Sequence, residues 1–366
     1  MVFFKNLIGF FIFNFLKLLI KDKKEVTKNN LLFVNTEQIG DLVVSSLILE
    51  NENLFSINSK IYFLIKDIYK NIFSAYNGSI ILVFYNHKKY KNNLFYRFKT
   101  LKKLQNLNLA ESYNVSPARG TINDEITLIS GTTKKFTTCS DLKYLGKYFG
   151  KYYNKKYTEL LFQNETNEYK KIINLIERLT NNPENKIVIF NEKTFNININ
   201  IRDKIPFQED YIVISPLTTN PIKNWGTDNY RQLCKSLSKD YNMLIIGLEK
   251  DINILKNISS GNTRIWTGSF EYIPSILSKS KLFIGNDSGL THLAYRLDIP
   301  MIAIIGGGSY GKFFPFESKS RKNKAIYLFH YLDCFGCRWE CKMKDTYCLS
   351  KITVHDVLKT IQKITE

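Results

Sequence analysis

Several features are missing from this sequence, and each absence narrows the class of protein. No helix-turn-helix, RNP or KH signature is present, so no recognisable nucleic-acid module accompanies the basic charge. No internal repeat of solenoid period is visible. Acidic residues are scarce, with 33 Asp and Glu against 52 Lys and Arg, which gives a formal net charge of +19. This imbalance leaves three kinds of partner: nucleic acid, an anionic membrane surface or an acidic substrate.

The N-terminal segment lacks an uninterrupted apolar run. A membrane-spanning helix needs about 20 largely apolar residues, and Lys5 and Lys17 interrupt the Phe-rich and aliphatic residues 1–20. No small-residue cleavage site follows, as a signal peptide would require. On a helix, the polar side gathers Asn6, Gly9, Asn14, Lys17, Lys21 and Lys24. We therefore expect residues 1–24 to form an amphipathic helix in the plane of a membrane surface, which places the protein in the cytoplasm, peripheral on the inner face of the cytoplasmic membrane. A helix packed on the protein itself and a spanning helix are the alternatives.

The remaining composition is that of a large α/β protein. At 366 residues, 44% of them hydrophobic, the chain can bury two substantial cores. Apolar runs alternate with amphipathic stretches, and the predicted strands lie near 31–35, 60–65, 79–85, 125–129, 211–215, 242–246, 281–284 and 301–305. A polar stretch predicts a domain boundary near residue 205, which separates residues 25–204 from residues 205–366. Residues 353–364 predict a terminal amphipathic helix.

The most informative motif is residues 285–294, Gly-Asn-Asp-Ser-Gly-Leu-Thr-His-Leu-Ala, which lie between two apolar runs. The pattern predicts a strand, a polar loop, a helix and a second parallel strand. Asp287 or Ser288 can cap the helix, and the first free N–H groups would then suit an anion such as a phosphate. Those N–H groups belong to Ser288, Gly289 and Leu290. Capping alone is the alternative, because many βα turns contain Asp, Ser and Gly for that purpose.

Two further segments have the same strand–loop–helix pattern. After the apolar residues 31–34, Gly40 and Asp41 open a helix, so Asp41 is either a helix-capping carboxylate or a general base at the mouth of the first βα turn. After the apolar residues 211–215 comes a loop that precedes a helix beginning near residue 227. Two hydroxyls and a lysine in that loop could surround a diphosphate: Thr218, Thr219 and Lys223.

Together, the three segments resemble glycosyltransferase family 9, the heptosyltransferase-like enzymes of bacterial surface polysaccharide assembly. The resemblance is carried by residues 39–41, by Thr218, Thr219, Lys223 and Trp225, and by residues 287–290 with His292. The family implies a GT-B fold, in which two Rossmann-like domains face each other across a cleft and a C-terminal helix crosses back onto the first. It also implies acceptor binding by the first domain, nucleotide-sugar binding by the second, and inversion at the anomeric carbon without an essential metal ion.

The resemblance also implies a role for each matching residue. Asp41 would deprotonate the acceptor hydroxyl, and Lys223 would counter charge on the leaving diphosphate. Glu249 stands where the family often has a carboxylate that bonds the donor ribose. The other donor-binding positions would be Thr218, Thr219, Asp287, Ser288, Gly289, Leu290 and His292.

The sequence departs from the family pattern at two positions. Ser288 stands where the family often has threonine, and Gly226 follows the tryptophan where proline is usual. Both departures bear on donor preference more than on the class of reaction. For His292, a packed or cap-supporting side chain is the alternative to a catalytic or donor-binding one.

Four of the six cysteines are clustered near the C-terminus. They are Cys334, Cys337, Cys341 and Cys348, and four thiolates can bind a structural zinc ion. Unbound thiols and disulfides are the alternatives, and a cytoplasmic enzyme should keep its thiols reduced. Many members of the resembled family carry a comparable cysteine group in this region, which implies a structural role outside the cleft.

We therefore expect an inverting, metal-independent glycosyltransferase with no catalytic cofactor. The donor would be a nucleotide sugar, with ADP-heptose as the candidate, and the acceptor a lipopolysaccharide-core or related glycolipid or oligosaccharide. An anionic membrane surface is the expected partner, and nucleic acid is not. Two other functions stay open: a nucleotide-sugar epimerase of the same fold, and a non-enzymatic, basic, zinc-dependent nucleic-acid binder. Strongly salt-dependent affinity for oligonucleotides would support the latter.

Overall fold

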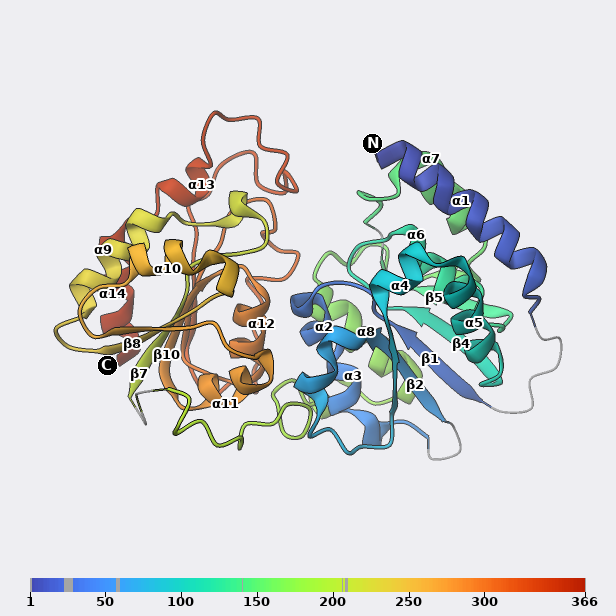
Figure 1. Ribbon diagram of the computed structural model, residues 1–366, viewed down its shortest axis with the longest axis horizontal. Helices are drawn as coiled ribbons and strands as arrows, with labels where there is room; N and C mark the ends of the chain where they lie inside the picture. The colour runs from blue at the N-terminus through green and yellow to red at the C-terminus, as the bar shows by residue number, and fades with distance from the viewer. Residues whose placement is uncertain are drawn as a thin grey trace. The chain divides into compact units, whose positions relative to one another are not determined.

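The computed structural model describes residues 2–22, 29–56, 60–139, 141–205, 207 and 210–365. The chain forms two compact units (Figure 1). Unit 1 comprises Met1–Lys70 and Asn77–Val188, and unit 2 comprises Asn71–Tyr76 and Ile189–Glu366. The division at Val188 falls upstream of the boundary expected near residue 205.

Unit 1 contains, within its described residues, a six-stranded parallel sheet in the order β3-β2-β1-β4-β5-β6. The strands are β1 (Asn30–Val34), β2 (Ile61–Lys66), β3 (Ile81–Tyr85), β4 (Leu109–Asn114), β5 (Lys134–Thr137) and β6 (Glu159–Leu160). The helices are α1 (Val2–Leu19), α2 (Ile39–Ser45), α3 (Leu47–Glu50), α4 (His87–Asn92), α5 (Leu94–Gln105), α6 (Thr121–Leu128), α7 (Gly146–Asn154) and α8 (Glu168–Thr180), with short 3-10 turns η1 (Glu52–Leu54), η2 (Asp67–Phe73) and η3 (Glu184–Lys186).

Helices cover both faces of this sheet, so its central strands are apolar on both sides. On one face, Leu32 and Val34 of β1 pack in a core with side chains of α1, α4, α5, α6 and α7. On the other face, Phe33 contacts the rings of Phe63 and Tyr113 on the neighbouring strands. Helices α2 and α3 pack against α8.

The predicted strand at residues 125–129 is wrong, because residues 125–128 belong to α6 and Ile129 is its C-cap. The apolar pattern is compatible with a strand, but a capping interaction favours the helix. At its start, the backbone N–H of Gly120 donates to Asn123 Oδ1 at 2.9 Å. The two successive acidic residues that follow are both fully buried, Asp124 against Arg119 and Glu125 against Arg97. Strands β4, β5 and β6 were not expected from the sequence.

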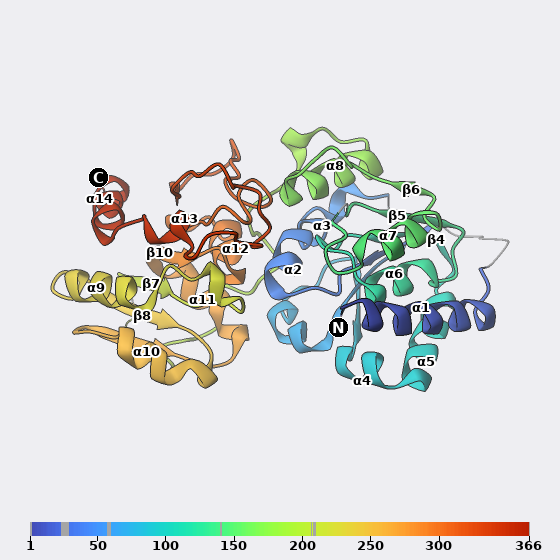
Figure 2. The ribbon, with the colours of Figure 1, turned by 90° about the horizontal axis from the view of Figure 1, so that it is seen from above.

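The N-terminal helix α1 packs on unit 1, against α6 and α7 (Figures 1 and 2). Part of its polar side faces the protein, since Asn6 is buried and donates to the carbonyl oxygen of Tyr144 at 2.7 Å. Lys17 pairs with Asp22 at 2.7 Å, whereas Lys24 lies outside the described residues. In the part of the chain that the structure describes, we find no helix with the length and apolar character to cross a membrane.

Unit 2 repeats the architecture of unit 1, with a six-stranded parallel sheet across its described residues in the order β12-β11-β10-β7-β8-β9. Its strands are β7 (Tyr211–Ser215), β8 (Asn242–Ile246), β9 (Thr263–Trp266), β10 (Ser280–Asn286), β11 (Met301–Ile304) and β12 (Ala325–Leu328). Its helices are α9 (Thr227–Leu237), α10 (Ile252–Ile258), α11 (Ile273–Ser278), α12 (Gly289–Arg296), α13 (Tyr347–Ser350) and α14 (Val354–Thr365), with 3-10 turns η4 (Pro221–Lys223), η5 (Glu249–Asp251) and η6 (Phe270–Tyr272).

The four strands expected in this half are confirmed as β7, β8, β10 and β11, whereas β9 and β12 were not expected. The terminal helix is confirmed as α14. It packs on α9 and β11 of unit 2, with Val357 and Ile361 buried in the same core as Ile212 and Ile302.

Both sheets have the strand order of a doubly wound nucleotide-binding fold, with the first and fourth strands of each unit adjacent. These neighbours are β1 and β4 in unit 1 and β7 and β10 in unit 2. The connections that follow the two strands of such a pair run to opposite faces of the sheet. A crevice therefore opens beyond the carboxyl ends of these strands. The fold class, two Rossmann-like α/β halves, is the predicted one.

Candidate active site

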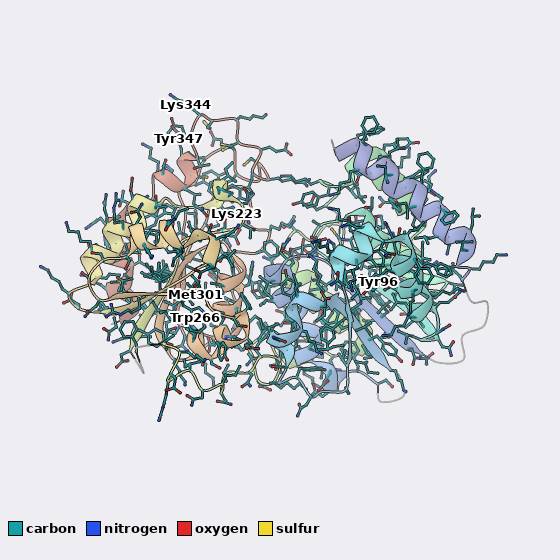
Figure 3. All side chains as sticks on the ribbon, viewed as in Figure 1. Tyr96, Lys223, Trp266, Met301, Lys344 and Tyr347 are labelled. Carbon is teal, nitrogen blue, oxygen red and sulfur yellow. The ribbon has the colours of Figure 1, made fainter. Side chains whose placement is uncertain are left out.

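The predicted donor-binding segments of unit 2 follow the two central strands of its sheet. The loop containing Thr218 and Thr219 follows β7, and Asp287 and Ser288 follow β10. Because β7 and β10 are parallel neighbours, both loops leave the same edge of the sheet. Lys223 lies among the loops of unit 2 (Figure 3). Segments that are far apart in the sequence are therefore brought together where the topology places a ligand.

The last residue of β10 connects these two loops. Asn286 is fully buried, and its Nδ2 donates to the carbonyl oxygen of Pro216 at 2.6 Å. Its Oδ1 accepts from the backbone N–H of Trp225 at 3.1 Å and from the hydroxyl of Tyr230 at 3.1 Å. A buried amide with all these partners holds the loop after β7 in one position against the end of β10.

Lys223 and Asp287 form a largely buried ion pair at this edge. Nζ of Lys223 lies 3.1 Å from Oδ2 of Asp287, whose side chain is 4% exposed, whereas that of Lys223 is 22% exposed. Burial alone would raise the pKa of Asp287, but the ammonium group of Lys223 and hydrogen bonds from Lys223 and Ser309 lower it below its ordinary value. Lys223 is the more exposed member of the pair, so its positive charge is available to an anion.

His292 is packed behind this pair. Its ring stacks on Phe314 at 4.8 Å and meets Phe313 edge-on, and its Nε2 lies 3.8 Å from Oδ1 of Asp287. Burial lowers the pKa of His292 to about 4, although Asp287 acts in the opposite direction. The imidazole is therefore neutral near pH 7. This position agrees with one of the two roles considered for His292, that of a packed side chain rather than a catalytic one. In this role the ring supports Asp287.

The helix after Asp287 provides backbone donors. Ser288 is the N-cap of α12, with extended backbone, and the helix begins at Gly289. Ser288, Gly289 and Leu290 are all partly exposed. The first N–H groups of a helix have no acceptor within the helix and carry the positive end of its dipole. Together with Lys223, they form a site suited to an anion.

The two threonines and Glu249 occupy different positions around this edge. The hydroxyl of Thr218 donates to the carbonyl oxygen of Asn220 at 2.6 Å, so it stabilises the loop, whereas Thr219 is exposed. Glu249 begins η5 after β8, the strand next to β7, and accepts a hydrogen bond from the hydroxyl of Thr267. All three residues lie at the carboxyl edge of the sheet, as a donor-binding role requires.

Two residues of this site escaped the sequence analysis. Ser309, at the end of the loop Gly306-Gly307-Gly308 after β11, bonds the carboxylate of Asp287. Its Oγ accepts from Nε1 of Trp339 at 2.7 Å, and the Trp339 ring lies 5.6 Å from Nζ of Lys223. The three glycines fit because a side chain at any of them would overlap the ring of Trp339 or Phe335. Three glycines directly after an apolar strand were a readable signal of such a close approach.

The segment that contains Trp339 also contains the cysteine cluster. Cys334, Cys337 and Cys341 are partly exposed, Cys348 is buried, and all four are free thiols. Across the described parts of the chain, which include these four, no group of three or more His, Cys, Asp or Glu side chains is gathered to hold a metal ion. Burial raises the pKa of the Cys348 thiol, and Cys334, Cys337 and Cys341 add to this rise. The structural zinc ion therefore stays a prediction.

Gly226 explains one departure from the family pattern. It is the N-cap of α9 and has φ of 115°, a conformation that side chains rarely adopt. Proline is restricted to φ near −65°, so it cannot occupy this position in the present loop. The helix start expected near residue 227 is confirmed, but the expected cap at Thr227 or Asp228 is wrong, because the N-cap is Gly226.

In unit 1, Asp41 lies in the first turn of α2, at the carboxyl edge of the sheet. The buried ammonium of Lys66, at the end of β2, lies near it: burial lowers the pKa of Lys66, whereas Glu37 and Asp41 raise it. Tyr69 borders the same group, and its pKa is raised to about 12 by burial and by Asp41. Asp41 is therefore one member of an ionisable cluster, of which the sequence analysis identified a single residue.

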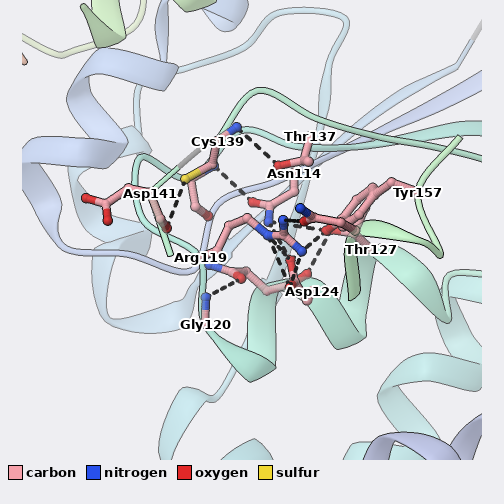
Figure 4. A network of polar contacts seen from close by, with 12 residues as sticks. Asn114, Arg119, Gly120, Asp124, Thr127, Thr137, Cys139, Asp141 and Tyr157 are labelled. Carbon is pink, nitrogen blue, oxygen red and sulfur yellow. Dashed lines mark hydrogen bonds and ion pairs between the residues drawn. The ribbon is translucent and has the colours of Figure 1, made fainter. Parts of the chain in front are cut away.

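A buried polar network supports this edge of unit 1 (Figure 4). Arg119, in the loop after β4, bonds both carboxylate oxygens of Asp124, at 3.0 and 2.7 Å, and the hydroxyl of Tyr157 donates to Asp124 at 2.7 Å. From the same helix, Nδ2 of Asn123 donates to Oε1 of Glu37 at 3.1 Å. The loops after β1 and β4 are thus tied together, as those after β7 and β10 are in unit 2.

Comparison with known proteins agrees with these features. Residues 159–334 match the model of glycosyltransferase family 9 (heptosyltransferase). A segment of 121 residues is 29% identical to lipopolysaccharide heptosyltransferase 2 of Salmonella typhimurium, and it covers 30% of this chain and 34% of that protein.

Solved structures extend the likeness to both units. The chain resembles a family 9 glycosyltransferase from Veillonella parvula with a TM-score of 0.70 and 15% identity, over 94% of this chain and 99% of that one. For the ADP-heptose lipopolysaccharide heptosyltransferase II of E. coli, the TM-score is 0.67 at 16% identity, over 92% and 98%. For E. coli heptosyltransferase WaaC with ADP, it is 0.62 at 15% identity, over 91% and 97%.

These matches agree with the family resemblance carried by the motifs, and the structural matches confirm the expected fold class. The match to glycosyltransferase family 9 (heptosyltransferase) spans residues 159–334, and the chain as a whole has the GT-B fold of that family's solved structures.

Proposed function

We propose that this protein is an inverting, metal-independent glycosyltransferase that uses a nucleotide-sugar donor. The observation that supports it most directly is the Lys223–Asp287 ion pair beside the N-terminus of α12, at the central strands of unit 2. A cation next to free backbone N–H groups matches the charge of a departing diphosphate. ADP-heptose is the first donor to test, because the similar E. coli heptosyltransferase WaaC has been solved with ADP.

In the proposed reaction, Asp41 accepts the proton of an acceptor hydroxyl. The hydroxyl oxygen then forms a bond to the anomeric carbon from the face opposite the diphosphate, while the bond between that carbon and the diphosphate oxygen breaks. The configuration of the sugar is inverted, and the nucleoside diphosphate leaves with the bonding electron pair. Lys223 and the N–H groups of Ser288, Gly289 and Leu290 stabilise its growing negative charge.

Asp287 and His292 act as positioning residues in this proposal. The buried carboxylate holds the ammonium of Lys223, and the neutral imidazole and Ser309 hold the carboxylate. Thr219 and Glu249 are the side chains at the rim that would contact the diphosphate and the ribose, respectively. The proposed acceptor is a lipopolysaccharide-core or related glycan, and the proposed location is the inner surface of the cytoplasmic membrane.

The proposal is tested by ligand-dependent unfolding without added metal. A ligand that binds the folded state alone, at 100 times its dissociation constant, adds about 2.7 kcal/mol of stability. We expect ADP or another nucleoside diphosphate to raise the melting temperature, and Asp41→Asn to retain this rise while losing sugar transfer. If no nucleotide changes the melting temperature at any concentration, the donor site is misassigned.

A further inference from the structure

Helix α1 is apolar on two opposite faces. The inner face contains Phe13 and Leu16, which are 0% exposed, as is Ile20 directly after the helix. The outer face presents large apolar side chains at spacings of four and three residues, which places them on one side of a helix. These side chains, called the outer stripe below, are Phe4 (70% exposed), Ile8 (60%), Phe11 (63%), Phe15 (48%) and Leu18 (75%). A surface helix of a globular protein normally turns polar residues outward, so the outer stripe needs a different explanation.

The inner face already fixes α1 to unit 1. The ring of Phe13 meets that of Tyr153 at 5.1 Å, and Phe10 meets Tyr152 at 4.7 Å. Asn6 donates to backbone carbonyl oxygens before α7, and Asp22, just beyond the helix, pairs with both Lys17 and Lys135. The outer stripe is thus carried on a firmly packed helix. Exposed apolar patches of this kind mark interaction surfaces.

Basic segments border the helix. Residues 142–158, which include α7, contain five lysines and no Asp or Glu: Lys143, Lys147, Lys151, Lys155 and Lys156. Residues 86–110, which include α4 and α5, also contain no Asp or Glu and have basic side chains at Lys88, Lys89, Lys91, Arg97, Lys99, Lys102 and Lys103. Contacts of α1 with α7, and of Lys21 with Gln105 at the end of α5, place these segments beside α1 (Figure 2).

We propose that the outer stripe inserts into the surface of an anionic lipid bilayer, with the lysines of α7, α4 and α5 contacting the headgroups. An apolar helix face with cationic neighbours is the pattern of an interfacial helix, which binds through apolar burial and through attraction to anionic lipid. A second copy of the chain is a poorer occupant. A two-fold contact through the stripe would bring one lysine-rich border against another, which opposes association.

This inference rests on the proposed function in one further respect: the outer stripe also indicates which class of acceptor the enzyme uses. Gly9 of α1 lies against Thr121, so closely that a Cβ added to Gly9 would be 2.9 Å from Cγ2 of Thr121, and Thr121 begins α6 in the connection that follows β4. The start of the outer stripe therefore lies near the carboxyl edge of the unit 1 sheet, the edge that carries Asp41. A bilayer on the stripe would bring a lipid-linked acceptor to that edge.

The test is co-sedimentation of the full chain with vesicles of phosphatidylglycerol and phosphatidylcholine, and with vesicles of phosphatidylcholine alone. We expect the protein to bind the anionic vesicles more tightly, with an affinity that falls as salt is raised. Phe4→Ser combined with Phe11→Ser should weaken binding by about tenfold or more, since binding scales with buried apolar area. Lys147→Gln combined with Lys151→Gln should weaken binding to the anionic vesicles alone. The control is Ile254→Ser, which removes a 42% exposed apolar side chain from α10 of unit 2 and should leave binding unchanged.

Three results would overturn the inference: no binding of the unaltered chain to anionic vesicles, binding that survives the double phenylalanine substitution, or a dimer in solution that this substitution abolishes. The last result would identify a second copy as the occupant. Both phenylalanines are exposed, so the variant should melt no lower than the unaltered protein. ADP binding, measured on the same proteins, separates the two proposals: vesicle binding without ADP binding refutes the proposed function alone, and ADP binding without vesicle binding refutes this inference alone.

Discussion

Replacing Lys223 with alanine tests the central element of the donor site. The substitution removes the cation that bonds Asp287 at 3.1 Å, and it leaves a carboxylate that is 4% exposed without that partner. An unsatisfied buried polar group costs about 1–3 kcal/mol, so the variant should be destabilised by that amount. Hydrogen bonds to charged groups contribute about 1.5–3 kcal/mol, which corresponds to roughly tenfold to hundredfold weaker binding of ADP.

A second substitution distinguishes a structural role of Lys223 from a donor-binding one. In the double variant Lys223→Ala/Asp287→Asn, the buried charge is removed together with its partner, so much of the lost stability should return. The affinity for ADP should stay low, because the cation is still absent. Isothermal titration with ADP and thermal unfolding measure the two quantities separately.

The matched control is Lys235→Ala, which removes an exposed lysine from α9 of the same unit and should change neither quantity. The reasoning is refuted if Lys223→Ala binds ADP as tightly as the unaltered chain. It is also refuted if the double variant recovers ADP affinity along with stability, since Lys223 would then act only by neutralising Asp287.

Other substitutions test the remaining steps. Asp41→Asn should lower sugar transfer by a factor of 100 or more, on the scale of about 10²–10⁴ for general base catalysis, with ADP affinity unchanged in titration; normal transfer would exclude Asp41 as the base. In the folded protein the pKa of His292 is lowered to about 4, whereas in the unfolded chain it has its ordinary value of about 6.5. As pH falls, the unfolded chain therefore takes up the proton at a higher pH than the folded protein does. About 3 kcal/mol of folding stability should be lost between pH 6.5 and pH 4. In chemical denaturation, His292→Phe should flatten that part of the pH profile, and an unchanged profile would contradict the assignment. Gly226→Ala should cost about 1 kcal/mol or more because of its φ of 115°, whereas an unchanged melting temperature would show that the loop tolerates a side chain there.

The sequence alone was sufficient wherever the signal was local. Strands β7, β8, β10 and β11 are buried on both faces, so each is a continuous apolar run that can be recognised without a partner. The loops that follow β1, β7 and β10 contain Gly, Asp, Ser or Thr next to a helix start, and their positions in the chain were enough to suggest phosphate binding and the family. Parallel topology then places such loops at one edge of a sheet.

Tertiary structure decided what depends on distant partners. Strand β4 has the polar sequence Leu-Ala-Glu-Ser-Tyr-Asn, and it is stable at the centre of the sheet because Ser112 and Asn114 bond groups of α6. The apolar residues near 126–129 are helical because a cap and two buried ion pairs favour that conformation over a strand.

The support of the donor site and the two faces of α1 were hidden for the same reason. Trp339, Ser309 and Asp287 form a hydrogen-bonded chain across more than 50 residues of sequence. In α1, a helical projection shows where apolar residues fall, but only the packing against α6 and α7 determines which of them remain exposed. Local composition fixes which elements can form, whereas burial and the pairing of charges, which are properties of the folded chain, decide which side chains are left to act.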